Sequence, residues 1–161
     1  ALTISFVLET ETAHLMPASR HRQVCENTRQ MAAKGKVLAT ALNCSVKCRE
    51  QVFTAAVLNG TGRLVLAMIE ANSPDLASQL KQVSSHPDIL ITVFLLTLWC
   101  FPQEVVKPLL GIQDAPQEND KSWITLLYYI HQYMKVKDNQ QQLADFTRTL
   151  PEDVKEALLR T

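Results

Sequence analysis

Glycine is scarce in this chain, and its scarcity counts against several classes of fold and site. Only four glycines occur among 161 residues, at positions 35, 60, 62 and 111. An all-β fold with many tight turns uses more of them. The four positions also cannot form the glycine-rich loop with which P-loop and dinucleotide-binding proteins hold phosphates. The sequence therefore favours neither an all-β fold nor a nucleotide-binding fold.

A net charge is also absent. Sixteen Lys and Arg residues balance sixteen Asp and Glu residues, and the isoelectric point is about 7.1. Such a chain lacks the overall positive field of a nucleic-acid binder, so we do not expect nucleic acid as a partner. The composition is 47% apolar and 20% charged, which is enough to bury a core and argues against disorder.

No uninterrupted apolar run has the length of a membrane span, and no segment has the pattern of a signal peptide. The longest apolar run covers positions 89–101, whereas a spanning helix needs about 20 residues, so this run predicts a buried helix. No basic region followed by an apolar stretch opens the chain. Because the first residue is Ala1 rather than Met, we expect a trimmed chain or a piece excised from a longer protein.

The cysteines and histidines do not have the spacing of a metal site or a catalytic site. The four cysteines include no CxxC pair, so we predict free thiols and a reducing compartment, cytoplasmic or nuclear. None of the histidines lies at metal-binding spacing; His86 is expected in a helix cap or turn and His131 on the solvent side of its helix. The carboxylates are scattered. We therefore expect that the chain binds no cofactor and no metal and that it is not an enzyme.

Helix-starting and helix-ending signals recur along the chain and predict an all-α fold. Proline follows or precedes a capping residue at several points, as in Ser73-Pro74-Asp75 and His86-Pro87-Asp88. Gly35 is expected to interrupt one helix, and the stretch from Asn59 to Gly62 to separate two others. We expect roughly eight or nine helices. The segments from which they form cover about residues 4–16, 19–33, 36–42, 49–58, 63–71, 74–82, 88–100, 102–110, 122–137, 139–150 and 151–159, and the second and third count as one if Gly35 only kinks the chain.

The helix expected over residues 88–100 is apolar on every side. A helix without a polar face is typical of a central position, covered by neighbours all round. Trp99 should then lie in the core, and replacing it with alanine should cost about 3–5 kcal/mol of stability.

Residues 31–72 resemble an armadillo repeat. Leu38-Ala39-Thr40-Ala41-Leu42-Asn43 is similar to the end of the third helix of a repeat, Arg49-Glu50-Gln51-Val52-Phe53 to the first helix, and residues 59–69 to the turn and second helix. The resemblance implies a right-handed α-solenoid of armadillo/HEAT-like short helices, forming a single helical-repeat domain over residues 1–161. It also implies a non-catalytic scaffold that binds a segment of a partner protein. In that family an Asn at the position of Asn43 bonds the backbone of an extended ligand; Asn43 could equally cap a helix end.

A second resemblance is to the Bcl-type apoptosis regulators. In that family a Gly-Arg pair precedes an apolar helix beside a groove, and Gly62-Arg63 followed by Leu64-Val65 is similar to this motif. The resemblance implies a helical bundle that takes an amphipathic helix in its groove.

Two sets of residues are candidate contacts for a partner protein or peptide. The first is a locally basic stretch in which only Glu26 opposes the cations Arg20, Arg22, Arg29, Lys34 and Lys36. It is either a solvated helix face or a docking surface for an acidic peptide or a nucleic-acid backbone. The second is the pair Tyr129 and Tyr133, four residues apart on one helix, which either edge the core or contact a partner.

Overall fold

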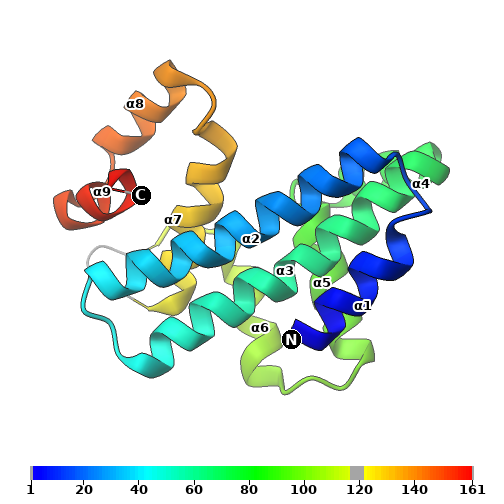
Figure 1. Cartoon of the computed structure of the whole chain (residues 1–161), viewed down its shortest axis with the longest axis horizontal. Helices are drawn as coiled ribbons and strands as arrows, with labels where there is room; N and C mark the ends of the chain where they lie inside the picture. The colour runs from blue at the N-terminus through cyan, green and yellow to red at the C-terminus, as the bar shows by residue number, and fades with distance from the viewer. Residues whose placement is uncertain (1, 117–121, 161) are drawn as a thin grey trace.

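A computed structural model describes residues 2–116 and 122–160 of the chain, and every regular element in these residues is a helix (Figure 1). The all-α prediction is therefore confirmed. The elements are α1 (Leu2–Thr12), α2 (Ala18–Ala41), α3 (Val46–Asn72), α4 (Pro74–Val83), α5 (Pro87–Leu98), α6 (Gln103–Leu110), the 3₁₀ helix η1 (Gly111–Gln113), α7 (Trp123–Val136), α8 (Gln140–Arg148) and α9 (Glu152–Leu159).

The helix-start signals in the sequence act as expected. Pro74 and Pro87 occupy the first turns of α4 and α5, where a missing N–H costs nothing. Three other starts are capped by side chains that accept a hydrogen bond from a backbone N–H in the first turn: Ser45, Ser122 and Asn139. The polar stretch at positions 113–120, which holds Pro116, predicts an exposed loop, and its residues 117–120 lie outside the described residues.

The helix breaks expected at the glycines do not exist. α3 runs unbroken from Val46 to Asn72, with Gly60 and Gly62 buried near its middle, and α2 continues straight through the buried Gly35. These glycines allow close contact between helices instead. A Cβ on Gly60 would lie 2.6 Å from Thr28 Oγ1 of α2, one on Gly62 2.9 Å from the Thr92 nitrogen of α5, and one on Gly35 2.6 Å from Val52 Cγ1 of α3.

The central helix is consequently α3, and the prediction that residues 88–100 fill this role is wrong. α3 is packed against α1, α2, α4, α5 and α7, and its residues 55–62 are buried on all sides. It is also long and apolar enough to cross a membrane by length and composition, but most of that segment is buried by its neighbours, as in a core helix. Figure 1 shows α2 and α3 side by side and antiparallel, with α1 beside one half of α3.

α5 is covered on one side only. Ile89, Thr92 and Leu96 are fully buried against the rest of the molecule, whereas the side chains of Phe94 and Leu98 are 65% and 63% exposed. Trp99 is 37% exposed and follows the last residue of the helix, so its predicted core position is also wrong. An apolar sequence alone could not reveal which side of this helix has a neighbour.

The main core joins α2, α3, α5, α6, α7 and α9. A smaller cluster of Met16, Val24, Cys25, Leu64 and Ala67 fills the space near the end of α1. All four cysteines are free, as predicted. Burial raises the pKa of the Cys25 thiol, and burial together with the neighbouring Cys44 raises the pKa of Cys48 to about 11.

The one-sided burial of α5 predicts a contrast between two leucines. Leu96→Ala should lower the free energy of unfolding by about 2–5 kcal/mol, because it empties a fully buried position. Leu98→Ala removes a mostly exposed side chain and should change stability by no more than about 0.5 kcal/mol. Chemical denaturation of both variants measures this, and equal losses would mean that the outer side of α5 is covered.

The close approach of α3 and α5 predicts that Gly62 tolerates no side chain. In Gly62→Ala the new Cβ would meet backbone atoms of Asp88 and Thr92, which cannot move aside as a flexible side chain can. We expect a net loss of about 1–3 kcal/mol despite the better helix propensity of alanine. Gly111→Ala is the control, because its Cβ would lie 3.5 Å from Ile124 Cγ2, an ordinary contact distance. A Gly62→Ala protein as stable as the control would contradict the packing.

Candidate functional site

The basic stretch on α2 is partly neutralised within the chain. Arg20 pairs with Glu70 of α3 at 3.3 Å, and Arg29 pairs with Glu9 of α1 at 2.6 Å. These acids come from other helices, so the local sequence count could not include them. Arg22 and Lys36 are exposed and have no acidic partner among the residues that the structure describes.

Asn43 terminates α2. Its φ of 54° lies in the left-handed region, which Asn adopts more readily than most residues, and the Cys44 N–H donates to the Ala39 carbonyl at 2.9 Å. This geometry is the Schellman ending of a helix. Asn43 thus has the helix-end role that the sequence left open beside ligand binding.

The two tyrosines lie half-buried at the edge of the main core on α7. Tyr129 packs edge-on against the neighbouring Tyr128, with ring centroids 5.8 Å apart. The Lys34 ammonium stands 4.3 Å from the centre of the Tyr133 ring, which is a cation–π contact between α2 and α7. The pair therefore has structural contacts, and Tyr133 also borders a surface pocket with Lys34 and Lys137.

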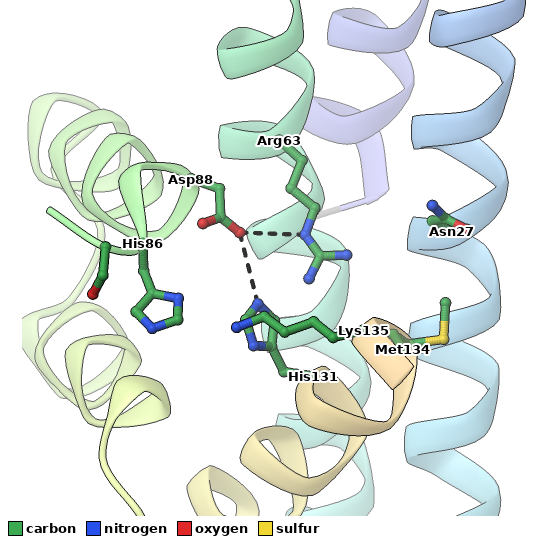
Figure 2. Close-up of a pocket in the computed structure, with 8 residues that line it drawn as sticks. Asn27, Arg63, His86, Asp88, His131, Met134 and Lys135 are labelled. Carbon is green, nitrogen blue, oxygen red and sulfur yellow. Dashed lines mark hydrogen bonds and ion pairs between the residues drawn. The ribbon is translucent and has the colours of Figure 1, made fainter. Parts of the chain in front are cut away.

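A polar pocket of about 270 Å³ lies where α3, α5 and α7 meet. We use the name polar pocket for the space among Arg63 of α3, His86 and Asp88 at the start of α5, and His131 and Lys135 of α7 (Figure 2). The contact between Gly62 and α5 places Arg63 beside Asp88. Four of these five residues are cations or potential cations.

Asp88 binds two of these groups through one oxygen. Its Oδ2 lies 3.4 Å from Arg63 Nε and 3.8 Å from His131 Nε2, as the dashed lines in Figure 2 indicate. The exposed fractions of the three side chains are 19% for Arg63, 15% for Asp88 and 4% for His131. Charges are therefore held together with little water around them, where they interact more strongly than on an open surface.

Burial and neighbouring charges act in opposite directions on Asp88. Burial disfavours its ionised form, but His131 and the positive charge of Arg63 outweigh this and lower the pKa of Asp88 to about 2. Burial lowers the pKa values of Arg63, His131 and Lys135, each partly offset by Asp88. Asp88 is thus ionised at neutral pH and the lowered pKa of His131 favours its neutral form. Because Nε2 is the nitrogen nearer the carboxylate, we assign the ring proton to Nε2.

One atom of the polar pocket is left without a partner. The Nδ1 atom of His131 is buried and has no hydrogen-bond partner among the described residues. A buried polar atom without a partner costs free energy, about 1–3 kcal/mol. Across residues 2–116 and 122–160, no three His, Cys, Asp or Glu side chains are grouped as a metal site needs.

Sequence reasoning did not find the polar pocket. His86 lies at the N-cap position of α5, as expected, but the prediction that His131 faces solvent is wrong. One signal was present: His131 follows Leu127 by four residues, so it lies on the same buried side of α7. Nothing in the sequence indicated that Arg63, Asp88 and His131 would meet.

An apolar groove runs along α2 and α3 on the side where α1 lies. It consists of two adjoining hollows of about 410 and 450 Å³ that share Phe53. The first lies beside α1 and is bordered by Leu2, Phe6 and Val57; the second is bordered by Val46 with Lys36 and Arg49. Phe6 is 71% exposed at its edge. We use the name apolar groove for these two hollows together.

Comparisons with protein-family models, with curated proteins and with solved structures gave no match to this chain.

The buried His131 predicts that stability falls below neutral pH. Because its folded-state pKa lies below the ordinary value of about 6.5, the unfolded chain takes up the proton first, and stability is lost as pH falls through 6.5. His131→Gln should flatten this decline, which for one proton is at most about 1.4 kcal/mol per pH unit. Denaturation at several pH values measures the slope.

His86→Gln provides the comparison for that experiment. Burial also lowers the pKa of His86, but its side chain is only half-buried, so this variant should reduce the slope less. A His131→Gln protein with the slope of the unmodified chain would show that His131 is not held neutral by burial.

Proposed function

We propose that this chain is a non-catalytic interaction module that binds an amphipathic, acidic helix of a partner protein in the apolar groove. The supporting observation is the groove itself, a concave surface with exposed apolar residues beside cations. Grooves of this kind take the apolar face of a helix through anchors at positions i, i+3, i+4 and i+7. The Bcl-type resemblance implies the same kind of occupant.

The lengths of the helices indicate where the partner would lie. α1 has 11 residues and packs beside α3, whereas α2 has 24 residues and α3 has 27. α1 therefore lies along less than half of this side (Figure 1). The residues that line the second hollow all come from α2 and α3. A partner helix lying along α2 and α3 would extend the layer that α1 begins.

The charges along the groove favour an acidic partner. Lys36 and Arg49 border the second hollow, and Glu50 is the one acid among its lining residues. Arg49 is held by a hydrogen bond from its Nε to the Cys44 carbonyl at 2.9 Å, whereas Lys36 is exposed and unpaired among the described residues. With Arg20 and Arg29 engaged inside the chain, Lys36 is the cation of the basic stretch placed to meet a carboxylate.

Of the two kinds of helical repeat, the proposal keeps only the HEAT-like one. An armadillo repeat needs a break between its first and second helices, and the continuous α3 has none. A HEAT-like unit of two antiparallel helices is compatible with α2 and α3, which a short connection joins at residues 42–45. The right-handed solenoid remains a prediction. The free thiols support the proposed location in the cytoplasm or nucleus.

The test uses a synthetic amphipathic peptide of about 18 residues, or five helical turns, with leucine on one side and glutamate flanking it. Fluorescence anisotropy of the labelled peptide should show saturable binding. Phe6→Ser should weaken binding by about tenfold, because it removes an exposed anchor at the groove. Phe94→Ser is the matched control, since Phe94 is similarly exposed on α5, outside the groove. Binding that Phe94→Ser weakens and Phe6→Ser does not would contradict the proposal.

Two further arms test the charge and the shape of the occupant. Lys36→Glu should slow association and reduce its salt dependence, whereas Arg22→Glu, on the same helix but outside the groove, should have little effect. A version of the peptide with two central prolines cannot form the helix and should bind much more weakly. Equal binding of the proline version would favour an extended segment, as armadillo-type scaffolds take.

A further inference from the structure

The polar pocket presents more positive charge than its single carboxylate neutralises. Arg63 and Lys135 each carry a charge of +1 and Asp88 carries −1, which leaves +1 before either histidine is protonated. The groups come from three separate helices and face one space of about 270 Å³ (Figure 2). Such an arrangement surrounds a small anion instead of contacting it from one side.

Several donors in the polar pocket are uncommitted. Arg63 gives its Nε to Asp88, and its two terminal nitrogens have no acceptor among the described residues. Lys135 is exposed and has no carboxylate within ion-pair distance there. Asp88 itself is already occupied by Arg63 and His131, so its charge is largely compensated.

The unpartnered Nδ1 of His131 adds a requirement of its own. Nε2 faces the Asp88 carboxylate and carries a proton, so Nδ1 of the neutral ring is an acceptor. An anion next to it must either bring a proton, as a singly protonated phosphate does, or bind together with the imidazolium form. In the first case the proton arrives with the ligand, and in the second the imidazole takes it up from solution. A carboxylate, fully ionised at neutral pH, supplies no such proton.

We propose that the polar pocket is a binding site for a phosphate group, held by Arg63 and Lys135 beside the His131 ring. Arg63 supplies its two terminal N–H pairs, a geometry suited to phosphate oxygens. The site opens to solvent beside Ser85 and Lys135, both exposed, so a phosphate carried by a larger molecule can also enter. The site differs from the apolar groove in its residues, and its test does not depend on the proposed function.

The experiment observes the imidazole nitrogens of His86 and His131 by NMR while inorganic phosphate is added at a constant ionic strength of about 0.15 M. The His131 signals should shift in a saturable way. Lys135→Gln should weaken binding by about tenfold, the effect of losing one hydrogen bond from a charged group. Lys137→Gln is the control. Lys137 directly follows the last residue of α7, lies outside the polar pocket, and donates from its Nζ to Gln30 Oε1 at 2.7 Å.

Sulfate and phosphoserine complete the experiment. Sulfate carries no proton near neutral pH, so it should bind only as His131 becomes protonated, and more steeply with falling pH than phosphate. A phosphoserine peptide that binds more tightly than inorganic phosphate would identify the group as one carried on a protein; equal affinity would indicate the free ion. The proposal is overturned if neither ligand shifts the His131 signals, or if Lys135→Gln and Lys137→Gln bind phosphate equally.

Discussion

The structure depends on the close approach of α3 to two helices at once. Gly60 and Gly62 are two residues apart, which places them about 200° apart around the helix axis, so one faces α2 and the other faces α5. Each glycine meets a threonine, Thr28 or Thr92, whose hydroxyl donates to the carbonyl four residues earlier in its own helix, at 2.9 or 2.8 Å. The buried hydroxyls are thus satisfied mainly within their own helices, and the Thr92 hydroxyl also lies 3.4 Å from Asn59 Oδ1 of α3. Two glycines inside a helix cost about 1 kcal/mol each, and the packing on both sides of α3 offsets this cost.

The same approach builds the polar pocket. Arg63 directly follows Gly62, and Asp88 precedes Thr92 by four residues, so the contact of Gly62 with α5 brings the guanidinium to the carboxylate. His131 of α7 then closes the cluster from the third side. Buried ion pairs are weak contributors to stability because desolvation offsets their attraction. A cluster that leaves Nδ1 of His131 without a partner is poorer still as a stabilising device, which makes a binding role the more economical explanation of its composition.

Much of the local structure follows from the sequence, whereas the tertiary contacts do not. Pro74 and Pro87 each begin a helix as the sequence predicts, because the effect of a proline on the backbone conformation is confined to neighbouring residues. A glycine can break an exposed helix or allow close contact between buried helices. Which of these two effects Gly60 and Gly62 have depends on residues far along the chain. α5 shows the same limit: its apolar residues predict burial, but only the position of α3 determines that Thr92 faces inward and Phe94 outward. Arg63, Asp88 and His131 are separated by 25 and 43 positions, so no local pattern joins them.

The ion pairs on α2 decide where its positive charge acts on other molecules. Exposed pairs such as Arg20–Glu70 and Arg29–Glu9 contribute little to stability, about 0–1 kcal/mol each, but they cancel the field of the cations they involve. The Lys34 ammonium lies against the Tyr133 ring and is held at α7. Lys36 keeps its charge free at the end of the helix that borders the apolar groove. A chain with no net charge can thus still attract an acidic partner at one place, because attraction at short range depends on local charge within a Debye length of about 8 Å and not on the total.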